Sequence, residues 1–296
     1  MIQEQCLYPQ TKPWFPAETP ISLANILVAT DFTETSDRAL EHALTLARTY
    51  NSKIFLAHII PVDHMMAPEL VEVAREQLSG AAREGMSRTL VPGRFIGVSH
   101  EEIIQEGALW PSIEALIGKY GINLIVVGTH RKGYVKKLLI GSSAEEIFRQ
   151  ARIPVLTVGP DVLREPYYCV ELKHILFATD FGPGVERQAT YAFSLAQEHR
   201  SRITLLHVEQ RPDEEQSIMH QMLELIPPGV GLHCLPLFRV ERGDPVKRIL
   251  EVAEDINADL IILGAKKRTS LAGHLPHTKA YQVISAASCP VLTIKS

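Results

Sequence analysis

A basic loop separates an apolar run from a helical pattern in residues 126–143, VVGTHRKGYVKKLLIGSS. Backbone N–H groups at the start of a helix, at the positive end of its dipole, can bind phosphate, and nearby hydroxyl or basic side chains strengthen such a site. The pattern predicts an anion site, although it also fits a capped helix that follows a solvated basic loop. The candidate phosphate-binding residues are Gly128, His130, Arg131, Gly141, Ser142 and Ser143.

A carboxylate follows the first apolar run, in the tetrapeptide formed by Thr30, Asp31, Phe32 and Thr33. At the carboxyl edge of a strand, such a carboxylate could accept hydrogen bonds from a ribose or from an adenine amine. The same residues also fit an ordinary helix start, in which Thr33 caps the helix and Asp31 favours its positive end. Both interpretations remain open at this point.

The chain contains two copies of one pattern. The segment ILVATDF at 26–32 returns as ILFATDF at 175–181, an offset of 149 residues. Later, INLIVVG at 122–128 returns as ADLIILG at 258–264, an offset of 136 residues. The first copy is therefore longer by 13 residues, and the extra length falls in a stretch that predicts a longer second helix.

Each copy alternates apolar strands with amphipathic helices, which predicts a buried parallel sheet with helices as crossovers. We expect an α/β fold with two tandem doubly wound, Rossmann-like domains, each with a five-stranded parallel sheet, helices on both faces and ligands at the carboxyl ends of its strands. Pro154 and Pro290 open the last strand of each copy, which suggests edge strands that could cover each other within the chain. The expected parts are an N-terminal arm (1–22), domain 1 (23–160), a linker (161–172) and domain 2 (173–296).

Composition argues against several classes of protein. A formal net charge of −4 and an isoelectric point near 6.3 give no overall attraction to nucleic acid or to an anionic membrane. No apolar run approaches the length of a membrane span, and the N-terminus lacks the pattern of a signal peptide. The four cysteines are too widely spaced to indicate a zinc site or a disulfide framework. These features predict a cytoplasmic protein with no nucleic-acid partner.

The paired motifs resemble the universal stress protein family in its tandem form, over residues 22–296. Nucleotide-binding members carry the pattern Gly-x-x-Gly-x9-Gly-Ser/Thr, and Gly128, Gly141 and Ser142 occupy its first, third and fourth positions. Arg131 stands where the pattern has its second glycine, so it could obstruct a triphosphate or bind it. The resemblance implies the fold of the adenine nucleotide alpha hydrolases and a site for ATP, AMP or ADP in domain 1, with Mg²⁺ accompanying the nucleotide. It also implies that Asp31 contacts the adenosine and that backbone at Ile59 meets the adenine.

The second copy departs further from this pattern. Lys267 and His277 occupy its second and third positions, and Thr278 keeps only the hydroxyl at the fourth. A glycine lets backbone approach phosphate closely, and a histidine ring does not. We therefore expect domain 2 not to bind ATP in the usual pose of the family.

The favoured hypothesis is a cytoplasmic stress-response regulator that binds an adenine nucleotide in domain 1. Little or no hydrolysis is expected, because the sequence has neither a GxxxxGK[ST] loop nor a carboxylate cluster with metal-ligand spacing. The alternative is a pseudo-dimeric scaffold of the same family that does not require nucleotide. An adenylating enzyme is a third and less favoured hypothesis, because a fold alone does not give a function.

Assembly follows from the repeat and from the resemblance. Single-copy members of the family form dimers, often through their last strands. This chain therefore resembles a covalently joined dimer whose two copies pair through those strands, which leaves both a monomer and a homodimer open.

Overall fold

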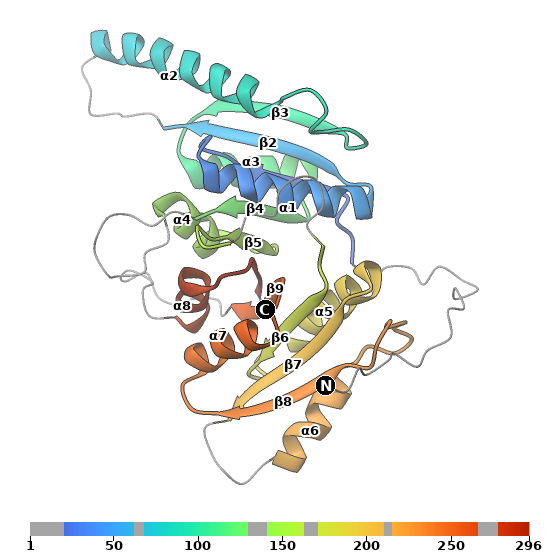
Figure 1. The fold of residues 1–296 in the computed structure, drawn as a ribbon. Helices are drawn as coiled ribbons and strands as arrows, with labels where there is room; N and C mark the ends of the chain where they lie inside the picture. The colour runs from blue at the N-terminus through green and yellow to red at the C-terminus, as the bar shows by residue number, and fades with distance from the viewer. Residues whose placement is uncertain are drawn as a thin grey trace. The chain divides into compact units, whose positions relative to one another are not determined.

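The computed structural model describes residues 21–61, 68–129, 141–162, 171–209, 215–265 and 278–295. These residues form two compact units, which we describe separately. The N-terminal unit comprises the described residues in 23–160. The C-terminal unit comprises those in 171–295, together with 21–22 and 161–162. In Figure 1 the N-terminal unit runs from blue to green and the C-terminal unit from yellow to red.

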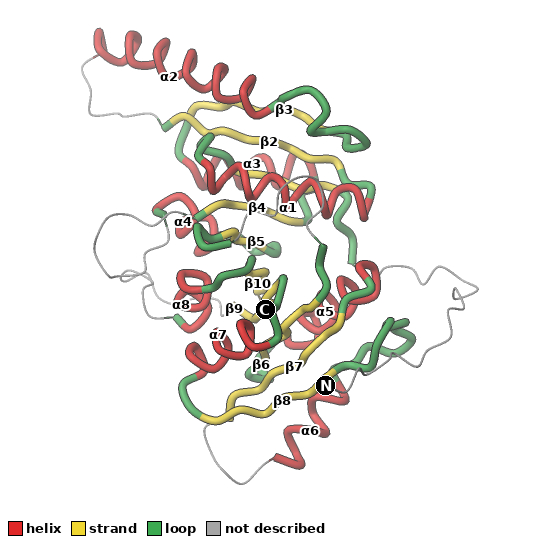
Figure 2. Tube along the Cα trace, viewed as in Figure 1, coloured by secondary structure: helices red, strands yellow, loops and turns green. Residues whose placement is uncertain are grey.

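The N-terminal unit is a five-stranded parallel sheet in the order β3-β2-β1-β4-β5. Strands and helices alternate along the chain, as Figure 2 shows. Its elements are β1 (Asn25–Ala29), α1 (Glu34–Tyr50), β2 (Lys53–Ile60), α2 (Pro68–Thr89), β3 (His100–Glu106), α3 (Leu109–Tyr120), β4 (Leu124–Gly128), α4 (Ser142–Gln150) and β5 (Val155–Val158).

The C-terminal unit repeats this topology, with a parallel sheet in the order β8-β7-β6-β9-β10. The prediction of two tandem doubly wound α/β domains is thus confirmed. The elements of this unit are β6 (His174–Thr179), α5 (Val185–His199), β7 (Arg202–Glu209), α6 (Glu215–Glu224), β8 (Leu237–Arg242), α7 (Pro245–Asp255), β9 (Leu260–Ala265), α8 (Lys279–Ala286) and β10 (Val291–Lys295).

The strand order reverses direction once in each unit. From β1 the chain moves to one side through β2 and β3, and then returns to build β4 and β5 on the other side. Right-handed crossovers that step in opposite directions place their helices on opposite faces of the sheet. Ligands of such folds bind where the order reverses, outside the carboxyl ends of the strands. In the N-terminal unit this switch point lies between β1 and β4, and in the C-terminal unit between β6 and β9.

Burial follows the sequence pattern. All five residues of β4 are buried, as expected for a central strand covered on both faces. Helix α1 buries one stripe at helical spacing, which includes Ala39, Leu40, Ala43, Leu44 and Ala47. These contacts fix the start of α1, and with it the turn that carries Asp31.

The second helix is longer in the N-terminal unit, as predicted from the offset of the repeats. Helix α2 has 22 residues and α6 has 10. Arg94, just beyond α2, is 9% exposed and ties this region to α1. Its guanidinium donates to Asp37 Oδ1 at 2.6 Å and to Glu41 Oε1 at 2.8 Å, and it also bonds the carbonyl of Thr89. The insertion therefore braces the first turns of α1.

Two cysteines lie among the described residues. Burial raises the pKa of the Cys289 thiol to about 12, so this residue packs as an apolar group and is not a nucleophile. Cys234 is disulfide-bonded, so wide sequence spacing did not exclude a bridge. None of the helices in the described ranges combines the length and the apolar character that a membrane-spanning segment requires.

Gly128, at the end of β4, allows this strand to approach the start of α1. A Cβ atom at position 128 would lie 2.6 Å from the carbonyl carbon and oxygen of Thr35 and 2.7 Å from the backbone nitrogen of Ser36. These three atoms belong to the backbone of a helix, so they cannot move aside as a flexible side chain could. The fold itself therefore requires glycine here, whatever the position contributes to a ligand site.

We predict that Gly128→Ala lowers the free energy of unfolding by about 1–3 kcal/mol, because the added methyl group overpacks a rigid contact. The matched control is Gly80→Ala, within α2, where a Cβ would meet nothing within 4 Å. That change should stabilise the protein by about 0.5–1 kcal/mol, because alanine is the better helix former. Urea unfolding measures both effects, and equal stabilities for the two variants would contradict this role of Gly128.

Candidate functional site

The switch point of the N-terminal unit brings together residues that are far apart in sequence. Asp31 follows β1, and Gly128 ends β4, the strand that pairs with β1. The N-terminus of α4 comes next along the chain after β4. Parallel strands end at a common edge, so the structure places the predicted carboxylate and the predicted helix start at the same edge of one sheet.

The turn after β1 orients Asp31. Phe32 adopts a left-handed backbone with φ of 62°, and its N–H donates to Thr30 Oγ1 at 3.0 Å. Asp31 Oδ1 accepts hydrogen bonds from the N–H of Thr33 at 3.2 Å and from its hydroxyl at 2.6 Å. Asp31 is nevertheless exposed. Its carboxylate is therefore pre-oriented by Thr33 and accessible to a ligand.

The hydroxyls of Thr30 and Thr33 have structural partners. Thr30 is 8% exposed, and its hydroxyl lies 3.1 Å from that of Ser36. Thr33 is the N-cap of α1, as the helix-start interpretation predicted, and its side chain accepts from the N–H of Ser36 at 3.4 Å. Both predicted site residues thus build the turn that presents Asp31.

His58, on β2, holds the other side of this turn. Its Nδ1 lies 2.8 Å from the carbonyl oxygen of Thr30, and its ring centroid lies 4.5 Å from that of Phe32. A carbonyl oxygen can only accept, so Nδ1 must carry the proton and donate. Gly85 of α2 leaves room for Phe32, because a Cβ there would lie 2.5 Å from its ring. The turn is thus fixed by packing and by a hydrogen bond.

The C-terminal unit repeats this arrangement. Phe181 has φ of 51°, and its N–H donates to Thr179 Oγ1 at 3.0 Å. His207 Nδ1 lies 2.9 Å from the carbonyl oxygen of Thr179, and its ring stacks against Phe181 at 4.8 Å. The histidine of the second strand therefore has the same hydrogen-bonding and packing role in both units.

The N-terminus of α4 has the form of an anion site. Gly141 is the N-cap and has no side chain to accept a hydrogen bond. The N–H groups of residues 142–144 have no acceptor within the helix, as at any helix start. Ser142 and Ser143 are exposed, so their hydroxyls can also reach a ligand. These are the backbone donors that a phosphate group requires.

Two of the predicted site residues, His130 and Arg131, lie outside the described residues. Ile59 is half-buried near the end of β2. The register of β1 against β2 ends with Ala29 opposite Ala57, whereas β2 continues to Ile60 along β3. Backbone at Ile59 thus extends beyond the reach of β1, on the same sheet edge as Asp31.

The corresponding helix start in the C-terminal unit differs. Thr278 is the N-cap of α8, and its hydroxyl accepts from the N–H of Tyr281 at 3.2 Å. One of the donors that a phosphate would use is therefore already bonded. Lys267 and His277 lie outside the described residues.

A pocket at the switch point of the C-terminal unit was missed by sequence reasoning. It is formed by the ends of β6, β7 and β9 with the starts of α5 and α8, and it includes Gln188 and Lys279. One signal was present in the sequence. Gln188 is a polar residue on the apolar face of its helix, and the repeat offset places Ala39 at the matching position of the first copy.

We predict that His58→Ala lowers the free energy of unfolding by about 1–3 kcal/mol, because the carbonyl of Thr30 then loses its donor. The control is His58→Asn, whose amide can place a donor near the position of Nδ1 and should recover part of the loss. Chemical denaturation compares the two variants. Unchanged stability in His58→Ala would contradict the structural role.

Known proteins resemble this chain in sequence. A family model described as the universal stress protein family matches residues 23–159 and 237–295. A universal stress protein of Mycolicibacterium smegmatis is 24% identical over 292 residues, which are 91% of this chain and 96% of that protein. A universal stress protein of Thermus aquaticus is 30% identical over 139 residues, which are 45% of this chain and 96% of that protein. About half of this chain therefore matches nearly all of that relative.

A solved structure extends the likeness to the fold. The crystal structure of a universal stress protein from Archaeoglobus fulgidus aligns with a TM-score of 0.71 at 20% sequence identity, over 92% of this chain and 98% of that one. Together with the family model, which matches well over half of the chain, these findings show that the chain belongs to the universal stress protein family.

Proposed function

We propose that the N-terminal unit binds an adenine nucleotide, namely ATP or its di- or monophosphate. The observation that carries this proposal is the start of α4, where the Gly141 cap leaves helix N–H groups for a phosphate. Asp31, oriented by Thr33, lies at the same sheet edge and supplies an acceptor for ribose hydroxyls. The protein would act as a stress-response regulator whose state depends on the bound nucleotide.

The remaining predicted contacts complete this proposal. Backbone at Ile59 would meet the adenine, as the family resemblance implies, because β2 extends beyond β1 there. Gly128 would leave room for the phosphates as well as for α1. His130 and Arg131 would add positive charge from the chain segment between β4 and α4.

In this proposal, Mg²⁺ accompanies the phosphates of the nucleotide. The described residues contain no group of three or more His, Cys, Asp or Glu side chains that could hold a metal ion. The chemistry of this chain's own residues is binding and orientation, so we propose little or no hydrolysis. We also propose a cytoplasmic location, where adenine nucleotides are abundant.

We propose further that the two copies pair within the chain through β5 and β10. Among the described residues of its own unit, each of these strands pairs with one neighbour, and a strand edge left open there invites association. Intramolecular pairing predicts a monomer of 33.0 kDa in sedimentation experiments. A stable dimer would instead favour pairing between two chains.

The alternative is a scaffold of the same family that needs no nucleotide. The structure of the C-terminal unit favours it in one respect, because the Thr278 hydroxyl already caps α8 and occupies one of its phosphate-binding donors. If the N-terminal unit also fails to bind ATP, the scaffold replaces the nucleotide proposal.

We predict that Gly141→Asp weakens ATP binding by roughly tenfold or more, because a carboxylate within about 4 Å of a phosphate costs about 1–4 kcal/mol. The backbone at Gly141, with φ of −56° and ψ of 147°, suits an aspartate N-cap, so the helix should keep its stability. Isothermal titration calorimetry measures the affinity, and urea unfolding checks the stability.

The matched control is Gly141→Asn, which has nearly the same shape without the charge and should retain more of the affinity. His277→Asp places the same carboxylate at the equivalent position of the second copy and should leave ATP binding unchanged. Failure of the wild-type protein to bind ATP at millimolar concentration would refute the proposal, as would unaltered binding in Gly141→Asp.

A further inference from the structure

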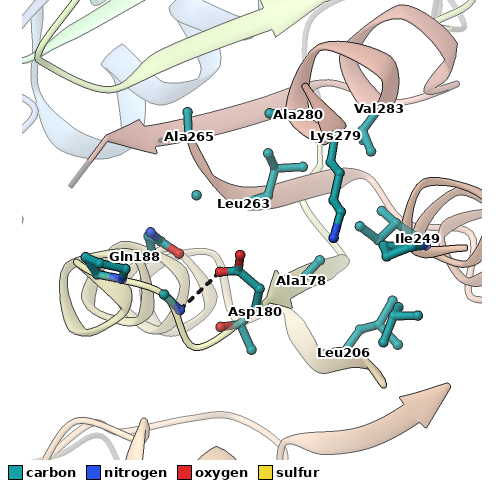
Figure 3. Close-up of a pocket in the computed structure, with 16 residues that line it drawn as sticks. Ala178, Asp180, Gln188, Leu206, Ile249, Leu263, Ala265, Lys279, Ala280 and Val283 are labelled. Carbon is teal, nitrogen blue, oxygen red and sulfur yellow. Dashed lines mark hydrogen bonds between the residues drawn. The ribbon is translucent and has the colours of Figure 1, made fainter. Parts of the chain in front are cut away.

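The C-terminal unit contains a pocket whose chemistry differs from that of the N-terminal site. It opens at the switch point between β6 and β9, beside the N-terminus of α8 (Figure 3). Its walls are mostly apolar, with side chains from Ala178, Leu206, Ile249, Leu263 and Val283. Walls of this kind accommodate the apolar body of a small molecule, and a few polar groups then fix its orientation.

The first polar group is the side-chain amide of Gln188. This residue is 6% exposed and lies on the face of α5 that lines the pocket, where Figure 3 shows its amide directed inward. The amide makes no hydrogen bond to any part of the chain that the structure describes. The amide is therefore left to face the pocket, where a bound molecule that offers both an acceptor and a donor can bond it.

Gly264 makes room for this amide. A Cβ at position 264 would lie 2.5 Å from the amide nitrogen of Gln188 and 2.8 Å from its oxygen. In the first copy the equivalent Gly128 packs against helix backbone, and Ala39 replaces the glutamine. The amide and the space for it are thus particular to the second copy.

The other polar groups carry opposite charges. Asp180 follows β6, and its Oδ1 accepts from the N–H of Gly182 at 3.0 Å. Lys279 begins α8, and its side chain extends into the pocket in Figure 3. Within the described ranges this lysine has no carboxylate partner. The pocket therefore offers a carboxylate, an amide and an ammonium group around an apolar interior.

Phosphate is a poor match to this set. Thr278 Oγ1 already bonds the N–H of Tyr281, which reduces the donors that α8 can offer to an anion. A single carboxylate on the ligand needs only one ammonium group, which Lys279 supplies. A carboxylate ligand is thus a better partner than a triphosphate.

We propose that this pocket binds a small zwitterionic amide with an apolar body, the chemistry of a short apolar dipeptide. The α-ammonium group of the ligand pairs with Asp180 and its carboxylate pairs with Lys279. The peptide group exchanges two hydrogen bonds with Gln188. The apolar side chains contact Leu206, Leu263 and Val283. This site lies in the other unit from the nucleotide site, so neither proposal depends on the other.

The experiment titrates leucyl-leucine into the full-length protein by calorimetry. We expect binding in the millimolar range or tighter, and we expect Gln188→Leu to weaken it by roughly tenfold, because one bonded amide is then lost. Lys279→Gln changes an exposed residue, should not disturb folding, and should also weaken binding. Gly141→Asp should leave dipeptide binding unchanged, which separates this site from the nucleotide site.

Two control ligands test whether the charges of the dipeptide and the chemistry of this pocket determine binding. N-acetyl-leucine amide keeps the peptide group and the apolar side chain but lacks both charges, so it should bind more weakly than leucyl-leucine. ATP should show no dependence on Gln188 or Lys279. The proposal is overturned if leucyl-leucine fails to bind at millimolar concentration, if neither variant alters its binding, or if ATP binding is lost in Lys279→Gln.

Discussion

The candidate nucleotide site depends on the close approach of the end of β4 to the first turn of α1. Gly128 permits this approach, because any side chain there would meet the backbone of Thr35 and Ser36. With α1 held at that distance, Thr33 can cap the helix and bond the carboxylate of Asp31. One steric constraint thus fixes both the carboxylate and the strand end that leads to the candidate phosphate-binding helix start.

The turn is held from its other side by an interaction that both copies retain. In each unit a histidine of the second strand donates to the carbonyl of a threonine at the end of the first strand. A phenylalanine whose backbone is in the left-handed conformation packs its ring against that histidine. Both copies keep this hydrogen bond and this ring contact. The copies differ instead in the residues that surround the turn. Gly141 caps α4 without a side-chain hydrogen bond, whereas the hydroxyl of Thr278 accepts a hydrogen bond at the start of α8.

Much of the fold followed from local patterns in the sequence. The repeated strand motifs predicted two doubly wound α/β units, and the change of offset predicted that α2 is longer than α6. The roles of Gly128 and Gly264 could not be predicted, because each depends on which atoms of a distant helix lie nearby. A phosphate-binding motif alone does not account for the two glycines. Gly128 lies against the backbone of α1, and Gly264 lies against the side chain of Gln188. The disulfide at Cys234 was missed for the same reason, because contacts in space are not visible in spacing along the chain.

The two switch points are alike in topology, and we propose that they take different ligands. Hydrogen exchange with and without ATP tests this most directly, because the amides at the start of α4 are proposed phosphate donors. We expect ATP to slow exchange in residues 142–144 and around Asp31, and to leave exchange at the start of α8 unchanged. Protection at α8 in place of α4, or no protection at either helix at saturating ATP, would contradict it.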